Sequence, residues 1–165
     1  MPKPQNIHPS MTLQARFQNM AQYGDSVGWD LDFRQLEPGP LEASLLVMGN
    51  EEIQLVRFRF NRAYHQLGEP PAGFVSFGLP DEEIGPLLWN GRQTPVKTLI
   101  NFSHEKQLDA VNPPGGSAGF VISIAPQVLE RSALDLGLGK NQLDGLLSRR
   151  FSDPLVSGAP VLRET

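Results

Sequence analysis

The chain contains three histidines, and the spacing of these imidazole groups decides whether a metal centre is expected. His8, His65 and His104 are far apart, and no two have the spacing of metal ligands on one strand or one helix. A metal site needs several imidazole or carboxylate ligands that converge on one point. Folding could bring His65 and His104 together across a sheet, beside Glu105 or Asp109, but ordinary surface histidines explain the pattern better. We therefore predict neither a metal nor another cofactor.

Motifs for nucleophilic catalysis and phosphate binding are missing as well. Residues 115–119 (GGSAG) place a serine among glycines, but no strand-to-helix elbow follows. Residues 137–141 (GLGKN) lack the leading strand, and the Ser or Thr after the lysine, that a phosphate-binding loop requires. The chain has no cysteine, which excludes thiolate catalysis, disulfides and cysteine-bound metals. The sequence predicts no catalytic residue and no enzyme.

Polar and aromatic side chains on otherwise apolar segments are the best candidates for ligand recognition. The five that we select are Trp29, Arg57, Arg59, Tyr64 and Trp89. Arg57 and Arg59 are two residues apart, so they project from the same face of a strand. If that face points inward, the two guanidinium groups need an anion or a carboxylate beside them. We favour the outward orientation, which places Phe58 and Phe60 in the core, although a shift of one residue in register reverses it.

The middle of the chain has the pattern of many short strands. Residues 29–35 alternate between apolar and polar, 41–48 are nearly continuously apolar, and 52–60 return after a turn at Gly49-Asn50. Asn90-Gly91 is a second strong hairpin signal. Further strands are predicted at 74–79, 96–102, 108–111 and 119–125. Short strands at this spacing are typical of a β-sandwich or barrel.

Helical spacing occurs at both ends of this β region. Leu13, Phe17 and Met20 predict a short N-terminal helix, and Pro126 and Asn141 suit the beginnings of two C-terminal helices. The leucine spacing in these last two helices suits either helix pairing in a dimer or packing against the strands. The residues that we select for dimerisation are Val128, Leu129, Leu136, Leu143, Leu146 and Leu147.

The bulk composition sets the remaining limits. A chain of 165 residues fits one domain, with a predicted N-terminal tail at 1–11, the domain at 12–151 and a linker-like tail at 152–165. A net charge of −4 argues against direct nucleic-acid binding, which usually needs a basic face. The beginning of the chain lacks the apolar segment of a signal peptide, and no apolar run is long enough to span a membrane. We therefore expect a cytoplasmic protein without membrane contact.

Several short motifs follow one another in an order that resembles a known family. They are Gly28-Trp29, RQLEPG at 34–39 followed by Leu41, QLG at 66–68, PAG at 71–73, FGLP at 77–80 and LWNG at 88–91. Each motif is short, and their order and spacing carry the likeness. Between about residues 17 and 138 the chain resembles the N-terminal sensor domain of AraC-type transcription regulators.

The resemblance implies a mainly β, cupin-like barrel of the double-stranded β-helix (jelly-roll) type, with a short N-terminal helix and two C-terminal helices. It also implies a domain that senses a small-molecule effector and forms a homodimer through the C-terminal helices. The DNA-binding domain of such regulators would lie outside these 165 residues, so that the chain is either a sensor domain or a stand-alone relative. Two alternatives remain open. One is a metal-free small cupin enzyme acting on a metabolite, for which His65, His104, Glu105 and Asp109 are the nearest candidates, and the other is a protein-interaction module with a filled barrel.

Overall fold

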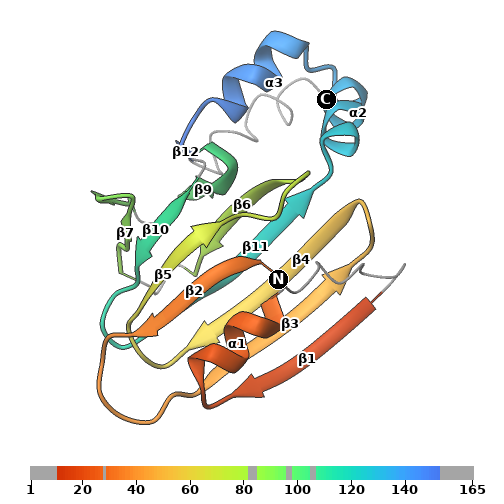
Figure 1. Cartoon of the computed structure of the whole chain (residues 1–165). Coiled ribbons are helices and arrows are strands. Elements are labelled where there is room, and N and C mark those ends of the chain that lie inside the picture. Colours follow the sequence, from red (N-terminus) through yellow and green to blue (C-terminus); the bar gives the residue numbers. More distant parts are fainter. Residues whose placement is uncertain (1–10, 28, 82–84, 96–97, 105–106, 153–165) are drawn as a thin grey trace.

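Two antiparallel sheets face each other in the computed structural model, which describes residues 11–27, 29–81, 85–95, 98–104 and 107–152 (Figure 1). The seven-stranded sheet has the order β1 (Met11–Phe17), β3 (Ala43–Gly49), β4 (Ile53–Phe60), β11 (Ser117–Ile124), β6 (Val75–Pro80), β9 (Leu99–Asn101) and β12 (Phe151–Ser152). The five-stranded sheet has the order β2 (Asp30–Gln35), β5 (Tyr64–Glu69), β10 (Leu108–Val111), β7 (Leu88–Trp89) and β8 (Arg92–Gln93). The described helices are α1 (Met20–Val27), α2 (Pro126–Asp135), α3 (Lys140–Leu147) and the 3₁₀ helix η1 (Phe102–His104).

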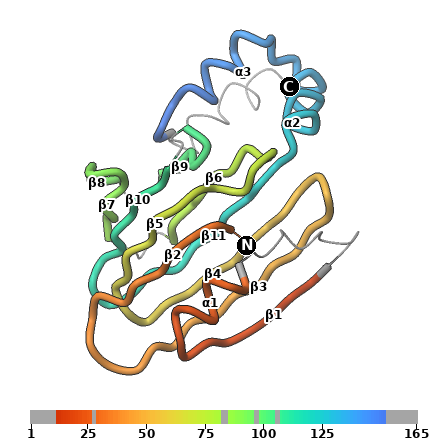
Figure 2. Tube along the Cα trace, in the orientation of Figure 1, coloured from red at the N-terminus to blue at the C-terminus, as the bar shows by residue number. Residues whose placement is uncertain are grey.

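This architecture confirms the prediction of a mainly β fold. Within the described residues the two sheets share no strand and do not close into a barrel, so the arrangement is a β-sandwich. At one side of the sandwich, α1 lies where a closing strand would be needed, between β1 and β3 of one sheet and β2 of the other (Figure 2). Met20 and Tyr23 of this helix are buried in the core, so α1 seals the side of the sandwich with apolar surface.

The predicted helix at Leu13 and Phe17 is wrong, because these residues form β1. A spacing of four residues fits one face of a strand as well as one face of a helix. Leu13, Ala15 and Phe17 are half-buried, and the residues between them are exposed, which is the alternation of a strand. β1 pairs along its whole length with β3, and the helix begins only at Met20.

The strands predicted around the first hairpin are confirmed, and their register fixes the inner and outer faces of the seven-stranded sheet. On β4, Val56 and Phe60 are buried, whereas Arg57 is half-buried and Arg59 is exposed. β4 therefore turns its aromatic side chains toward the other sheet and its arginines outward. The strand β5 was not predicted, because its polar residues and Gly68 interrupt the alternation of apolar and polar residues that is typical of a strand.

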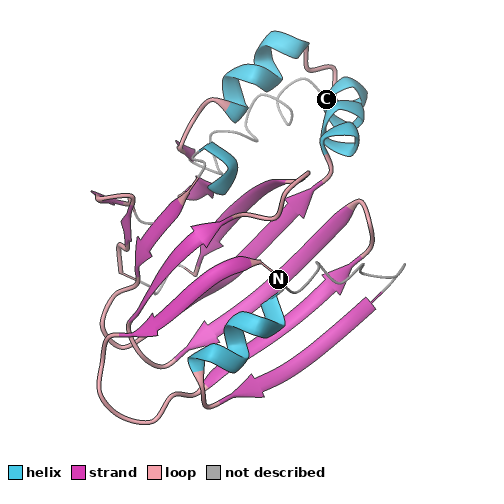
Figure 3. Cartoon of the chain, in the orientation of Figure 1, coloured by secondary structure: helices cyan, strands magenta, loops and turns pink. Residues whose placement is uncertain are grey.

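The two C-terminal helices lie beyond the ends of β6 and β11 (Figure 3). Pro126 begins α2 at the first helical position, as predicted, whereas α3 begins one residue earlier than predicted, after Gly139. The buried Asn101 of β9 holds the end of α3, because its side-chain Nδ2 donates to Leu147 O over 2.8 Å and its backbone N–H donates to Arg150 O over 2.9 Å. The short strand β12 then pairs with β9, so the polypeptide returns to the sheet after α3.

The terminal segments that we predicted as tails, 1–11 and 152–165, lie outside the described residues except for the strand ends at Met11 and Ser152. In the part of the chain that the structure covers, no helix is both long enough and apolar enough to cross a lipid bilayer.

Candidate site between the sheets

A cavity of about 60 Å³ lies between the two sheets. Its lining comes from both sheets and from the segments that connect them. The residues that form it are mostly aromatic or aliphatic: Tyr23, Trp29, Leu31, Phe33, Val56, Phe58, Tyr64, Gln66, Gly78, Leu79, Pro80, Leu87, Trp89, Ile100, Phe102, Asn112, Phe120 and Val121. Small-molecule sites are typically of this kind, concave and apolar with a few polar groups. Of the five residues predicted to bind a ligand, Trp29, Tyr64 and Trp89 line this cavity.

On one side of the cavity, Tyr23, Phe33 and Tyr64 line it and pack against Phe60 behind them, and we call these four residues the tyrosine cluster. The ring centroids of Phe60 and Tyr64 are 4.2 Å apart, and those of Tyr23 and Phe60 are 4.5 Å apart. The hydroxyl of Ser117 donates a hydrogen bond to Tyr64 Oη over 3.2 Å. Burial raises the pKa of both tyrosines above the ordinary value, so both phenols stay neutral.

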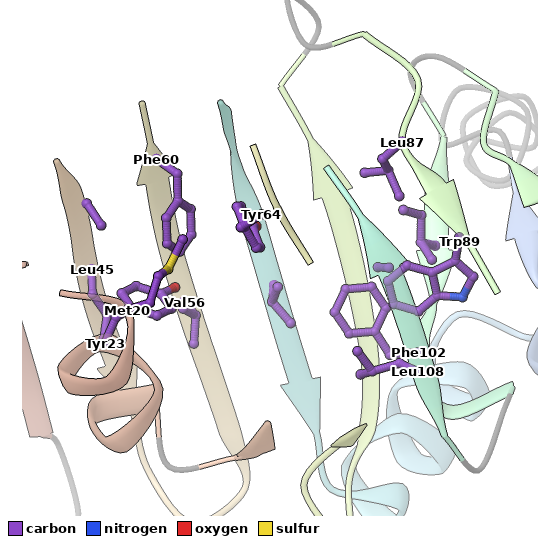
Figure 4. Close-up of a cluster of buried hydrophobic side chains, with 14 of the residues drawn as sticks. Met20, Tyr23, Leu45, Val56, Phe60, Tyr64, Leu87, Trp89, Phe102 and Leu108 are labelled. Carbon is purple, nitrogen blue, oxygen red and sulfur yellow. The ribbon is translucent and has the colours of Figure 1, made fainter. Parts of the chain in front are cut away.

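The other side is a tryptophan cluster, formed by Trp29, Trp89 and Phe102. Figure 4 shows Trp89 and Phe102 side by side. Phe102 contacts both indoles: it stacks on Trp89 with centroids 4.6 Å apart, and it meets Trp29 edge-on at 5.8 Å. The stacked position needs a glycine at Gly78 of β6, because a Cβ atom there would collide with the Phe102 ring. Sequence reasoning missed Phe102 and Gly78, since nothing in the local pattern shows that β6 and η1 meet.

Three of the residues that line this cavity carry a buried nitrogen without a hydrogen-bond partner. Among the described residues, four buried side-chain nitrogens have no hydrogen-bond partner, and three of them belong to the cavity lining: Trp29 Nε1, Trp89 Nε1 and Asn112 Nδ2. A buried donor that makes no hydrogen bond costs about 1–3 kcal/mol. Asn112 was also missed by sequence reasoning, although a polar residue that ends an apolar strand, directly before Pro113-Pro114, is a usable signal.

Arg57 and Arg59 do not line this cavity. They border a groove on the outer face of the seven-stranded sheet, together with Arg16, Ser44 and other polar residues of β1 and β3. Arg57 makes a bidentate ion pair with Asp81, with nitrogen–oxygen distances of 2.6 and 2.7 Å, and its guanidinium lies 4.4 Å from the Phe120 ring centroid. The hydrogen bonds from Arg57 lower the pKa of Asp81. A role of the two arginines in ligand binding stays a prediction.

The residues named as candidates for an enzyme active site, His65, His104, Glu105 and Asp109, are only partly brought together by the fold. His65 Nε2 lies 2.8 Å from Asp109 Oδ1 across the β5–β10 pairing, and Asp109 is exposed. Glu105 lies outside the described residues, and His104 lies in η1. In the described part of the chain, no group of three or more His, Cys, Asp or Glu side chains is placed to hold a metal ion.

The residues selected for dimerisation differ widely in exposure. Val128 and Leu143 are buried, Leu129, Leu146 and Leu147 are half-buried, and Leu136 is 57% exposed. Leu134, which was not predicted, is 71% exposed and lies beside Leu136 at the end of α2. Among the described residues of the two C-terminal helices and the turn between them, Leu134 and Leu136 are thus the most exposed large apolar side chains.

Comparisons with known proteins give one structural match. No protein-family model matches the sequence, and no curated protein matches it significantly. The structure is similar to the crystal structure of the AraC-like transcriptional activator CuxR, with a TM-score of 0.52, 12% sequence identity and a match probability of 1.00. The fold is one that an AraC-like activator also adopts. The match covers 82% of this chain and 57% of the CuxR chain, so the present chain spans little more than half the length of that activator.

Proposed function

We propose that this chain is the effector-sensing and dimerisation domain of an AraC-type transcription regulator. In this proposal the sandwich is a cupin-like, jelly-roll-type domain, the cavity between the sheets binds a small-molecule effector, and a separate domain recognises DNA. The protein would then act in the cytoplasm, and this chain would itself make no contact with DNA. The motif order between residues 17 and 138 and the shared fold with CuxR support this assignment.

The observation that carries the proposal is the cavity. Most β-sandwiches of this size fill the space between their sheets, since interiors are packed as densely as organic crystals. Here the aromatic lining from both sheets leaves about 60 Å³ unfilled and keeps three N–H donors without partners. A bound effector would fill this space, and ligand binding would thereby be coupled to the packing of the two sheets.

Dimerisation is proposed through the exposed end of α2. Leu134 and Leu136 are large apolar side chains on the surface, whereas the other leucines of α2 and α3 are buried or half-buried. Native mass spectrometry of the purified protein tests this part. We expect a dimer that Leu134→Glu with Leu136→Glu converts to a monomer, whereas Met48→Glu, an exposed apolar residue on β3, leaves the dimer intact. A monomeric wild-type protein would contradict the proposal.

Effector binding is tested by thermal unfolding with a panel of metabolites. We expect at least one compound to raise the unfolding temperature, and the rise to be lost in Phe102→Leu, which disrupts the tryptophan cluster. Asp81→Asn, on the outer face of the sheet, serves as the matched control and should keep the response. A compound that stabilises both variants equally binds elsewhere, and would contradict the cavity as the effector site.

A protein-interaction module is the second candidate, because the outer face of the seven-stranded sheet exposes large apolar side chains. Met48 and Ile53 are 39% and 38% exposed, and the pairing of β3 with β4 places them on one face. Apolar patches of this kind often mark interaction sites. If Met48→Glu abolishes self-association or partner binding and no metabolite stabilises the protein, this second function is favoured.

A further inference from the structure

We infer that the open edge of β1 binds an extended, acidic segment of a partner protein, which adds a further strand to the seven-stranded sheet. β1 is the last strand at one edge of this sheet, and all seven of its residues pair with β3 (Figures 1 and 2). In the described part of the chain, the β1 backbone makes no hydrogen bond outside this pairing. The N–H and C=O groups along its other side can therefore pair with an incoming strand. No residue of β1 lines the cavity, so this surface is separate from the proposed effector site.

The other sheet edges differ from β1 in ways that discourage pairing. Natural edge strands avoid unwanted partners by being short, charged, bulged or interrupted by proline. Within the described residues, β8 and β12 are two residues long each, and β2 carries Asp30, Asp32 and Arg34 among its six residues. β1 has seven residues without proline or glycine, pairs with β3 without a bulge, and carries one charge, that of Arg16. Of the described edges, β1 is therefore the best template for a further strand.

The two faces of β1 specify the side-chain pattern of the partner segment. Leu13, Ala15 and Phe17 are half-buried on the side that faces the core, whereas the residues between them are exposed on the outer face. A further strand continues this alternation, because side chains on neighbouring strands lie next to each other on the same face of a sheet. The partner segment is therefore apolar at alternate positions and polar at the positions between them.

The charges on the outer face favour acidic residues at these polar positions. The strand register aligns Arg16, Ser44 and Arg59 in one row across β1, β3 and β4. Both arginines are exposed, and neither makes an ion pair with a described residue. The charge of Arg59 acts on Asp81, but the carboxylate of Asp81 is already bound by Arg57. A glutamate opposite Arg16 would complete a cross-strand pair of opposite charges, whereas a lysine there would be repelled.

A surface groove beside β1 leaves room for such carboxylates. The groove has a volume of about 790 Å³, and its lining includes Arg16 and Arg59. Its lining contains one carboxylate, that of Glu42, which lies just beyond the last β1–β3 pair, formed by Phe17 and Ala43. The groove is therefore predominantly positive next to β1, which suits an acidic partner.

The experiment titrates the purified protein with blocked, fluorescently labelled peptides that match β1 in length. One peptide alternates valine with glutamate, and the other alternates valine with lysine. We expect fluorescence anisotropy to show tighter binding of the glutamate peptide. Amide hydrogen exchange in β1 should also become slower when this peptide is bound, because the N–H groups of the open edge become hydrogen-bonded.

Methylated peptides distinguish strand addition from simple charge attraction. Successive N–H groups of an extended chain point to opposite sides. Methylating the valine nitrogens of the glutamate peptide therefore blocks one edge, and methylating the glutamate nitrogens blocks the other, without a change in charge. We expect one of these two peptides to lose binding and the other to keep it.

Variants of Arg16 test the source of the charge preference. Arg16→Ala should bind the glutamate peptide about 1.5- to 5-fold more weakly, which is the contribution of one cross-strand pair. Arg16→Glu should reverse the preference in favour of the lysine peptide. Arg34→Ala is the matched control, because it removes an exposed charge from the edge strand of the other sheet, and it should leave the affinity unchanged.

Four results would overturn the inference. The first three are no binding of the glutamate peptide at about 1 mM, equal binding of the two methylated peptides, and an unchanged preference in Arg16→Glu. The fourth is an oligomer that persists when Leu134→Glu and Leu136→Glu are combined and in which β1 exchanges slowly without peptide, because a second copy of the chain would then occupy the edge. None of these results concerns effector binding in the cavity, which the metabolite panel tests separately.

Discussion

The two sides of the same interior are built on different principles. In the tyrosine cluster, rings from α1, β2, β4 and β5 pack closely, and the Tyr64 hydroxyl is hydrogen-bonded to Ser117. In the tryptophan cluster, the rings come from short or irregular segments, and the indole N–H groups have no hydrogen-bond partner. The two clusters therefore differ in how their buried polar groups are satisfied: the tyrosine side pairs a buried hydroxyl, whereas the tryptophan side leaves two N–H groups unpaired.

The largest expected effect is on the tyrosine cluster. Phe60→Ala removes a buried ring that contacts both tyrosines, and we expect the free energy of unfolding to fall by about 3–5 kcal/mol. Urea denaturation measures the change. Phe102→Ala, the matched change in the tryptophan cluster, should cost less, because Phe102 lies in a short 3₁₀ helix whose surroundings can relax more readily than the long strand β4. Equal losses in the two variants would break the distinction between the clusters.

A substitution at Gly78 tests the effect of adding side-chain volume to the tryptophan cluster, whereas the alanine variants above remove it. Gly78→Ala places a Cβ atom against the Phe102 ring, and overpacking of this kind costs about 1–3 kcal/mol. Because Phe102 must move, tryptophan fluorescence should change as well. The control is Gly85→Ala, where a Cβ atom meets no neighbour, and it should leave both stability and fluorescence unchanged.

Removing one polar group from each cluster sharpens the comparison further. Tyr64→Phe deletes a hydroxyl that Ser117 uses, so it should cost about 1 kcal/mol. Trp89→Phe deletes a donor without a partner, so the relief of that group should offset the lost packing and leave a net change of no more than about 1 kcal/mol. Chemical denaturation of the two variants decides the point. A loss of about 3 kcal/mol or more in Trp89→Phe would mean that the packing or hydrogen bonding of the indole outweighs the cost of its unpaired N–H.

The smallest expected effect is on the stability of the fold in acid, through Glu37, whose carboxylate lies next to the tyrosine cluster. The carboxylate of Glu37 accepts hydrogen bonds from the backbone N–H groups of Ala63 and Gly115, and these bonds lower the pKa of Glu37 below its ordinary value of 4.5. A carboxylate with a lowered pKa stabilises the fold above about pH 4.5, and this stabilisation is lost as the pH falls through the folded-state pKa. Thermal unfolding of Glu37→Gln should therefore depend less on pH in acid than the wild type. Glu51→Gln, in the exposed turn before β4, is the control.

The sequence predicted the strands and the C-terminal helices well where the pattern was unambiguous. Alternation in β2 and β4 and Pro126 at the beginning of α2 are local signals, and the structure confirms them. The N-terminal helix was misplaced, because Leu13 and Phe17 satisfy the periods of both a strand and a helix. β5 was missed, because a strand in the middle of a sheet can be polar on its solvent face.

The candidate site was predicted only in part, for a topological reason. Trp29, Tyr64 and Trp89 were selected because large aromatic residues often line pockets. Phe102, Asn112 and Gly78 reach the same place only through the pairing of β6 with β9 and of β10 with β5 and β7. No local pattern encodes these long-range pairings. The outward direction of Arg57 and Arg59, in contrast, followed correctly from the need to bury Phe58 and Phe60.

The pairing of β9 with β12 has a mechanical consequence. Asn101 anchors the backbone that leaves α3, and the next residue along the chain is Phe102, whose ring rests against both tryptophans. The segment that follows α3 is thus joined to the wall of the cavity through two neighbouring residues, Asn101 and Phe102. Any displacement of the Phe102 ring would act on β9 and, through the β9–β12 pairing, on Phe151 and Ser152.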